Sequence, residues 1–423
     1  MRNSGFNHQL QLVSARFSFF WMVAANLVGM WMAALLIWPR AGEWTGRFGY
    51  GRWMPLHMDW HLYGWCSLPL LGLLFRWFLT GNERSPRHAL AGFFMWSFAL
   101  FLGGFLCLFG LTSGKLFLMW SGPSRILFPA VQAFIWSLLA GHVVKRWKDE
   151  GWSTGVNLRL VVLLVLSSSP IALFIASGQS VYPPVDPASG GATGHSLLAS
   201  TLGIIGVFGL MPHLAGATGY HRATIAGRLY LGAFLASVLA WMLLDHGNES
   251  NTQPGQILGL AVLLPWIPLI GFYFLSFEWG KSLHVWVLSF LGWWLLLTLT
   301  GFATFLSPVL TILKFTNGMV AHAHLAMGGM ITSFNMVVLA VLGDRDRQGA
   351  WTDPGGWWMW QSGCLVYVLA MLIQGFREGL DPSVLYSENT LTNLAYSARF
   401  LAGAAMLAAS LRWLVLSFKY ESR

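Results

Sequence analysis

Twelve long apolar runs constrain the fold of this sequence more than any other feature. Each is long enough to cross about 30 Å of hydrocarbon as a helix. Because only 10% of the 423 residues are charged, against roughly 25% in soluble proteins, we predict an all-α, polytopic membrane protein. The runs cover approximately residues 17–39, 54–80, 89–111, 123–144, 158–178, 193–216, 224–245, 256–277, 283–306, 317–343, 356–376 and 391–418.

Short connections join these runs, which predicts one membrane domain over residues 1–423 and no separate soluble domain. The longest polar link, residues 178–194, is rich in Pro and Gly and is therefore predicted not to be helical. The run that begins near Phe17 lacks a small-residue cleavage site, which favours a first membrane helix over a removable signal. No C-x-x-C pair is present, so neither covalent c-type haem attachment nor a cysteine zinc site is encoded.

The distribution of basic residues predicts the orientation of the chain. Sixteen of the 25 lysines and arginines fall in, or within four residues of, the N-terminus, the even-numbered loops and the C-terminal tail, and seven fall in or as close to the odd-numbered loops. The positive-inside rule then places both termini in the cytoplasm. The same distribution explains the net charge of +9, so the expected partner of this charge is the lipid bilayer and not nucleic acid.

With this topology, six histidines from four runs share one depth near the outer face: His57, His61, His195, His246, His322 and His324. Ionisable side chains inside a membrane are costly and mark functional sites by default. Histidines at i and i+2 point about 200° apart on a helix, so His322 and His324 address different partners. Neutral imidazole is a common ligand of haem iron and copper. The shared depth therefore favours a joint haem or metal site over unrelated histidines hydrogen-bonded to neighbouring helices.

Five segments occur in the order of a known family: RWMPLHMDWHLYGW (52–65), LTSGKLFLMW (111–120), TGHSLLASTLGIIGVFGLMP (193–212), KFTNGMVAHAHLAMGG (314–329) and GGWWMWQSGCLVYVLAMLIQGFREG (355–379). With these motifs the chain resembles the main subunit of the haem–copper oxidase superfamily, nearest the cbb3-type oxidases and the related nitric oxide reductases. The resemblance covers most of the chain. Twelve spans with both termini inside also match this family.

The resemblance implies haem b as the cofactor, in one or two copies. His57 and His324 would be the axial ligands of a low-spin haem, and His322 would ligate a high-spin haem on the opposite face of its helix. His61 has no counterpart in the motif. Since it lies one turn from His57, we expect it to contact a haem propionate or to support His57.

The family also holds a non-haem metal with three histidines, one from the sixth span and an adjacent pair from the end of the seventh. Here the sixth span supplies His195, and the expected His-His pair reads Asp245-His246. Two imidazoles and a carboxylate are compatible with copper and suit non-haem iron better. The alternative is that the metal site has been lost. The tyrosine that the oxidases carry near the start of the seventh span is also missing, since Gly227 precedes Arg228 there.

Three functions follow from these observations. The first is a respiratory oxidoreductase that reduces oxygen or nitric oxide at a modified dinuclear site. The second is a haem-bearing electron-transfer or scaffold subunit that has lost the reducing centre. The third, a cofactor-free transporter, is disfavoured by the histidine layer and the ordered motifs. We expect a bacterial inner-membrane protein that works with other membrane subunits and a cytochrome c-type or quinol electron donor.

Overall fold

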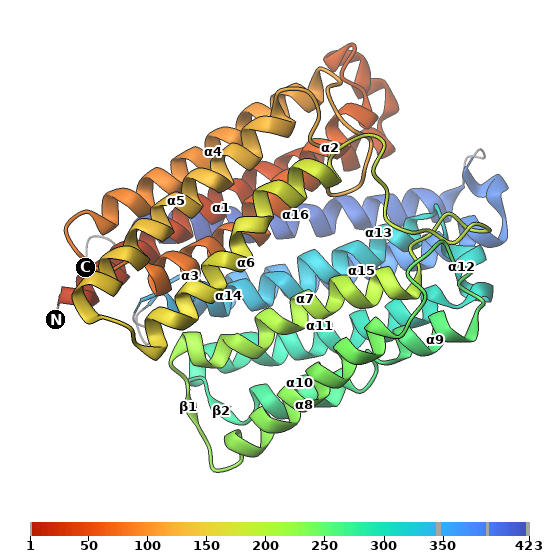
Figure 1. Cartoon of the computed structure of the whole chain (residues 1–423). Helices are drawn as coiled ribbons and strands as arrows, with labels where there is room; N and C mark the ends of the chain where they lie inside the picture. The colour runs from red at the N-terminus through yellow and green to blue at the C-terminus, as the bar shows by residue number, and fades with distance from the viewer. Residues whose placement is uncertain (1, 344–347, 386–388, 420–423) are drawn as a thin grey trace. The chain divides into compact units, whose positions relative to one another are not determined.

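The computed structural model describes residues 2–343, 348–385 and 389–419, and most of them are helical (Figure 1). Contacts within the chain divide it into two compact units. The described residues of Met1–Tyr182, Val338–Trp360 and Gly403–Arg423 form the first unit, and Pro183–Val337 with Gln361–Ala402 form the second. The single membrane domain expected from the sequence stays a prediction.

The first unit is built from the N-terminal helices. Figure 1 shows α4, α5 and α6 running side by side, and α1 packs against α2, α3 and α4. Its elements are α1 (Arg2–Ile37), the 3-10 segment η1 (Pro39–Thr45), α2 (Tyr50–Asp59), the π-helical segment η2 (Trp60–Cys66), α3 (Leu68–Phe78), α4 (Ser85–Leu108), α5 (Ser124–Glu150) and α6 (Thr154–Ala176).

The second unit holds the central helices. Among them, α7 packs on α8 and α9, and α11 packs on the π-helical segment η3. A two-stranded antiparallel pair, with Thr218 opposite Glu278, joins two of its connections. Its elements are α7 (Gly194–Ala215), β1 (Thr218–Gly219), α8 (Ala223–Met242), α9 (Pro254–Ala261), α10 (Trp266–Phe274), β2 (Phe277–Glu278), α11 (Lys281–Phe305), α12 (Ser307–Leu313), α13 (Asn317–His324), η3 (Leu325–Ile331) and the 3-10 segment η5 (Pro382–Leu385).

Three helices contribute residues to both units: α14 (Thr332–Val341), α15 (Pro354–Leu380) and α16 (Thr390–Lys419). The short 3-10 segment η4 (Ala350–Thr352) precedes α15. Within the first unit, Arg412 of α16 forms a bidentate ion pair with Asp353, with Nε–Oδ2 and Nη2–Oδ1 distances of 2.6 and 2.9 Å. This pairing accounts for an arginine that lies inside the last apolar run.

The helices confirm the polytopic membrane fold. Among the described residues, eleven helices are long and apolar enough to cross a membrane. The remaining predicted span is the second in chain order, residues 54–80. It is also helical, but η2 divides it into α2 and α3. The link at 178–194 forms no helix before Gly194, as its composition predicts.

Two helices extend beyond their apolar runs because their polar positions are buried. The first helix begins at Arg2 and not near residue 17, and Gln11, only 1% exposed, donates to the carbonyl oxygens of Leu339 and Ala340. Likewise α15 runs past the predicted end at 376 to Leu380. Hydropathy does not register the hydrogen bonds of buried polar residues, which help to hold such segments in place.

Lysine 115 fixes the connection after α6. Its side chain is 8% exposed, and Nζ donates to the carbonyl oxygens of Ala176, Gly178 and Val181. The ammonium also lies 4.6 Å from the centroid of the Tyr182 ring. A buried ammonium needs such a set of partners. The lysine in the carboxylate-poor loop at 111–120 therefore anchors the C-terminal end of α6.

Candidate functional site

His57 of α2 lies in the first unit, with its imidazole packed against α1. Its Nδ1 is 2.8 Å from the carbonyl oxygen of Ala25, so Nδ1 carries the proton and donates. Gly29, one turn further along α1, makes room for the ring, because a Cβ there would lie 2.6 Å from Cε1 of His57. A donating Nδ1 fixes the tautomer whose lone pair is on Nε2. This is the usual arrangement of a metal-binding histidine.

His61 lies beside His57, within η2. The two ring centroids are 4.8 Å apart and the ring planes are nearly perpendicular, at 81°. The structure thus places His61 edge-on against the imidazole of His57. This position fits the supporting role expected for His61, which stays a prediction.

His322 and His324 belong to α13 in the second unit. The Nδ1 of His324 donates to the carbonyl oxygen of Val320 at 2.8 Å. The Nδ1 of His322 lies 3.3 Å from Oγ1 of Thr300 on α11. The same hydroxyl also lies 2.7 and 3.2 Å from the carbonyl oxygens of Leu296 and Leu297. His324 therefore has the same tautomer as His57, with the lone pair on Nε2, because its Nδ1 faces a carbonyl oxygen, which only accepts.

An aromatic ring and a guanidinium back His324. The Tyr367 ring stacks on the imidazole with a centroid distance of 4.0 Å and an interplanar angle of 23°. On Tyr367 lies the Arg399 guanidinium, 5.4 Å from the ring centroid. Tyr367 and Arg399 are only 5% and 6% exposed. This stack restricts rotation of the His324 ring about its side-chain bonds.

The two helices that carry the predicted haem ligands, α2 and α13, are each followed directly by a π-helical segment. Trp60–Cys66 follows α2, which carries His57, and Leu325–Ile331 follows α13, which ends at His324. Single π turns inside α-helices are rare and occur often at functional sites. Neither segment is predictable from the sequence pattern, since hydropathy does not distinguish an α turn from a π turn.

His195 and His246 come together at one end of the second unit. Their ring centroids are 3.9 Å apart, and Trp241 stacks on both rings at 5.3 and 5.1 Å. His195 is 8% exposed, and among the described residues neither of its ring nitrogens has a hydrogen-bond partner. His246 is exposed and its Nε2 donates to the carbonyl oxygen of Trp241 at 3.2 Å. A buried imidazole with two unsatisfied nitrogens fits a position that binds a further group.

The third predicted ligand, Asp245, is engaged within its own loop. Its Oδ1 accepts from the backbone N–H of Gly247 at 2.7 Å. Gln256 of α9 ties this loop to α7, since it accepts from the N–H of His195 at 2.9 Å and donates to the Asp245 carbonyl oxygen at 3.2 Å. Among the described residues, no group of three or more His, Cys, Asp or Glu side chains is arranged to hold a metal ion. The metal set of His195, His246 and Asp245 stays a prediction.

Glu378, near the end of α15, anchors the start of α13 and was not identified from the sequence. The carboxylate is 4% exposed. It accepts from the backbone N–H and the side-chain amide of Asn317 at 2.8 and 2.6 Å, and from Nε2 of Gln374 at 3.1 Å. Arg399 in turn donates to Oδ1 of Asn317 at 3.3 Å. A carboxylate at a helix N-terminus is favoured by the helix dipole. Glu378 therefore fixes the first residue of the helix that presents His322 and His324.

Substituting Gly375 by alanine is expected to displace this helix. Gly375 lies one turn before Gly379 on α15, and a Cβ at either position would collide with backbone atoms, those of Gly318 and of Ile312 respectively. Backbone cannot move aside as a flexible side chain does, so we expect a loss of about 1–3 kcal/mol or more in the free energy of unfolding. Denaturation in detergent would measure it. Gly271→Ala on α10 is the control, since nothing lies within 4 Å of a Cβ there, and an equal loss in both variants would contradict the prediction.

Comparison with known proteins supports the family resemblance. No model of a known protein family matches the chain. The chain is 24% identical over 409 residues to the Cbb3-type cytochrome c oxidase subunit CcoN1 of Stutzerimonas stutzeri, covering 88% of this chain and 84% of that protein. The similarity therefore extends over most of the chain. Together with the ordered motifs, it confirms that this multi-pass membrane protein resembles the main subunit of the haem–copper oxidase superfamily.

Proposed function

We propose that this protein is the haem-bearing main subunit of a respiratory membrane complex. His57 and His324 would be the axial ligands of a low-spin haem b, and His322 would ligate a second, high-spin haem. The observation that carries the proposal is the shared tautomer of His57 and His324. Each donates from Nδ1 to a carbonyl oxygen, which places the lone pair on Nε2, the nitrogen that can bind iron.

The number of protein ligands on a haem iron determines which chemistry the haem supplies. A haem with two histidine ligands passes electrons, whereas a haem with one keeps a position for a small molecule such as oxygen or nitric oxide. The chain's own residues orient the imidazoles. Ala25 and Val320 accept from Nδ1 of His57 and His324, and Tyr367 holds the plane of the His324 ring.

Reduction of oxygen or nitric oxide would need a non-haem metal beside the high-spin haem. His195 supports this, because it is buried with two unsatisfied ring nitrogens and lies next to His246. Copper or iron would be held by these two imidazoles with Asp245. The second candidate function is electron transfer or scaffolding without that metal. It is supported by Asp245, whose Oδ1 accepts from the backbone N–H of Gly247.

The setting of the protein follows from the same resemblance. We propose the bacterial inner membrane as its location, with both termini in the cytoplasm, other membrane subunits as partners, and a cytochrome c-type or quinol electron donor. The histidine layer is expected near the outer face, so the donor would dock there.

A carbon monoxide difference spectrum with a metal analysis tests the proposal. For the wild type we expect a reduced-minus-oxidised spectrum of haem b and a carbon monoxide shift that is absent in His322→Leu. One copper or iron per chain beyond haem, with rapid consumption of oxygen or nitric oxide, would support the reductase. Haem without extra metal and without carbon monoxide binding would support the electron-transfer subunit. A wild-type protein with no haem absorbance would refute both functions.

A further inference from the structure

A basic cavity of about 960 Å³ lies in the first unit, between the N-terminal part of α1, the α3–α4 connection and α5. Arg84 and Lys145 line it with positive charges, and His88 and His142 line it with imidazole rings. One carboxylate, Glu83, also lines it. The haem ligands and the predicted metal set do not belong to this cavity. Its lining is suited to an anion.

A second cavity of about 160 Å³ adjoins the first, since Phe6 and Gly81 line both. Two guanidinium groups, those of Arg76 from α3 and Arg146 from α5, line it. Among the described residues, Nη1 of Arg76 and Nε of Arg146 are buried without a hydrogen-bond partner. Buried N–H groups of a cation are costly to leave unsatisfied. Two guanidinium groups that line one small cavity, each with an unsatisfied nitrogen, therefore favour an anion there.

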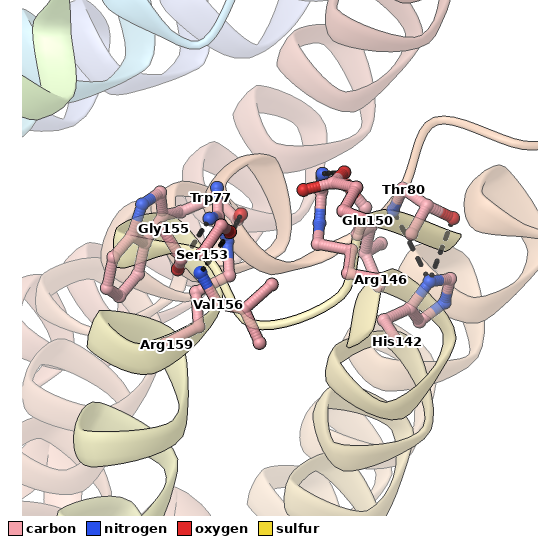
Figure 2. A network of polar contacts seen from close by, with 10 residues as sticks. Trp77, Thr80, His142, Arg146, Glu150, Ser153, Gly155, Val156 and Arg159 are labelled. Carbon is pink, nitrogen blue, oxygen red and sulfur yellow. Dashed lines mark hydrogen bonds and ion pairs between the residues drawn. The ribbon is translucent and has the colours of Figure 1, made fainter. Parts of the chain in front are cut away.

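The rest of Arg146 is held in place by the protein. Its Nη2 donates to the carbonyl oxygen of Leu79 at 3.0 Å, and Nη1 pairs with Glu150 at 3.3 Å (Figure 2). The exposed carboxylate of Glu150 thus takes one edge of the guanidinium. The buried Nε lies on the other edge. Arg146 is positioned but incompletely satisfied.

A pair of histidines forms a rigid wall of the larger cavity. Nδ1 of His88 and Nε2 of His142 lie 2.9 Å apart. On its other side, Nδ1 of His142 accepts from the backbone N–H of Thr80 at 3.3 Å and lies 3.2 Å from the Thr80 hydroxyl (Figure 2). Because that Nδ1 is an acceptor, Nε2 carries the proton and donates to His88. The hydrogen-bonded chain orders both rings before any ligand binds.

The chemistry of the cavities points to a phosphate group, and their surroundings point to a lipid. Guanidinium groups bind phosphate with paired, charge-assisted hydrogen bonds. Basic pockets between membrane helices on the cytoplasmic side bind acidic headgroups, and the positive-inside rule places this end of the unit in the cytoplasm. Beyond the cavity, α4 exposes an apolar stripe, Leu90, Phe94, Phe98 and Phe101, with exposures from 39 to 60%. It lies roughly 120° around the helix from His88 and suits contact with the lipid acyl chains of a bilayer.

We propose that the two cavities form a binding site for the headgroup of an anionic phospholipid. Arg76 and Arg146 contact the phosphate, and Lys145 and Arg84 face the outer part of the headgroup. This site is independent of the haem function, and neither proposal depends on the other.

Native mass spectrometry of the whole chain in detergent tests this site. The probe is palmitoyl-oleoyl phosphatidylglycerol, compared with the phosphatidylcholine of the same chains. We expect the wild type to bind phosphatidylglycerol more tightly, and Arg76→Gln/Arg146→Gln to lose about tenfold or more of that affinity. The control, Arg87→Gln/Lys148→Gln, removes the same charge at exposed positions outside both cavities and should retain wild-type affinity.

Several results would overturn the proposal. One is equal binding of the two lipids, and another is an equal loss of affinity in both double variants, which would show only a general charge effect. If inorganic phosphate binds the delipidated chain as tightly as phosphatidylglycerol does, the ligand is free phosphate and the lipid assignment is wrong. If the glutamine variant does not fold, Arg76→Lys/Arg146→Lys replaces it. This variant keeps the charge but loses the paired donors, so unchanged affinity in it would refute the guanidinium contacts.

Discussion

Replacing His324 by alanine is expected to remove the low-spin haem from the purified protein, and His57→Ala is expected to do the same. Loss of either axial imidazole leaves the iron without the strong field of two nitrogen ligands, so the sharp reduced α-band should disappear. Haem content per chain and the reduced-minus-oxidised spectrum measure the effect. If His322 ligates a second haem, His324→Ala should retain it, and carbon monoxide should still bind.

His61→Ala is the matched control for this pair. His61 packs edge-on against His57, so its loss should leave both haems bound and shift the reduction potential of the low-spin haem. A low-spin spectrum that survives in His57→Ala but vanishes in His61→Ala would exchange the two assignments. Retention of the wild-type spectrum in all three variants would refute the proposed ligand set.

Replacing Glu378 by alanine is expected to lower the free energy of unfolding by on the order of 3 kcal/mol, because two donors of the part-buried Asn317 each lose a charge-assisted acceptor. Since Asn317 begins α13, the start of the histidine helix would fray. We therefore expect Glu378→Ala to release haem at a lower denaturant concentration than the wild type. Unfolding in detergent, followed by helicity and by haem absorbance, measures both effects.

Asp381→Ala provides the comparison for Glu378. Asp381 lies three residues further along, is exposed, and accepts from the backbone N–H of Ser383 at 3.0 Å. An exposed position of this kind usually changes stability by within about 0.5 kcal/mol. Equal destabilisation by the two substitutions would show that Glu378 does not anchor α13.

The sequence predicted the helices well where apolar surface determines them. Inside a bilayer every backbone N–H and C=O needs a hydrogen bond within its own segment. A long apolar run of this kind therefore forms an α-helix. For this reason the predicted run 224–245 corresponds closely to Ala223–Met242. The six histidines predicted to lie near the outer face stand out for a related reason, because ionisable groups are conspicuous in apolar runs.

The features that position the site were not predictable from hydropathy. Glu378 follows the predicted end of its span at 376, where a charged residue is typical of a helix end near water. In the structure the carboxylate is buried. It contacts Gln374, one turn earlier on the same helix, and Asn317, 61 residues earlier in the chain. Gln256 is similar, since its role depends on the N–H of His195, 61 residues away. Long-range hydrogen bonds between polar residues leave no periodic pattern in the sequence.

The two π-helical segments make chain length itself a determinant of the site. A residue added to or removed from an α-helix turns everything beyond it by about 100°. η2 and η3 each follow a helix that carries proposed haem ligands and span seven residues. A single-residue deletion in either would rotate the rest of its helix relative to those histidines without changing any ligand. Insertions and deletions in these segments should therefore be excluded during the divergence of this protein, even where substitutions are tolerated.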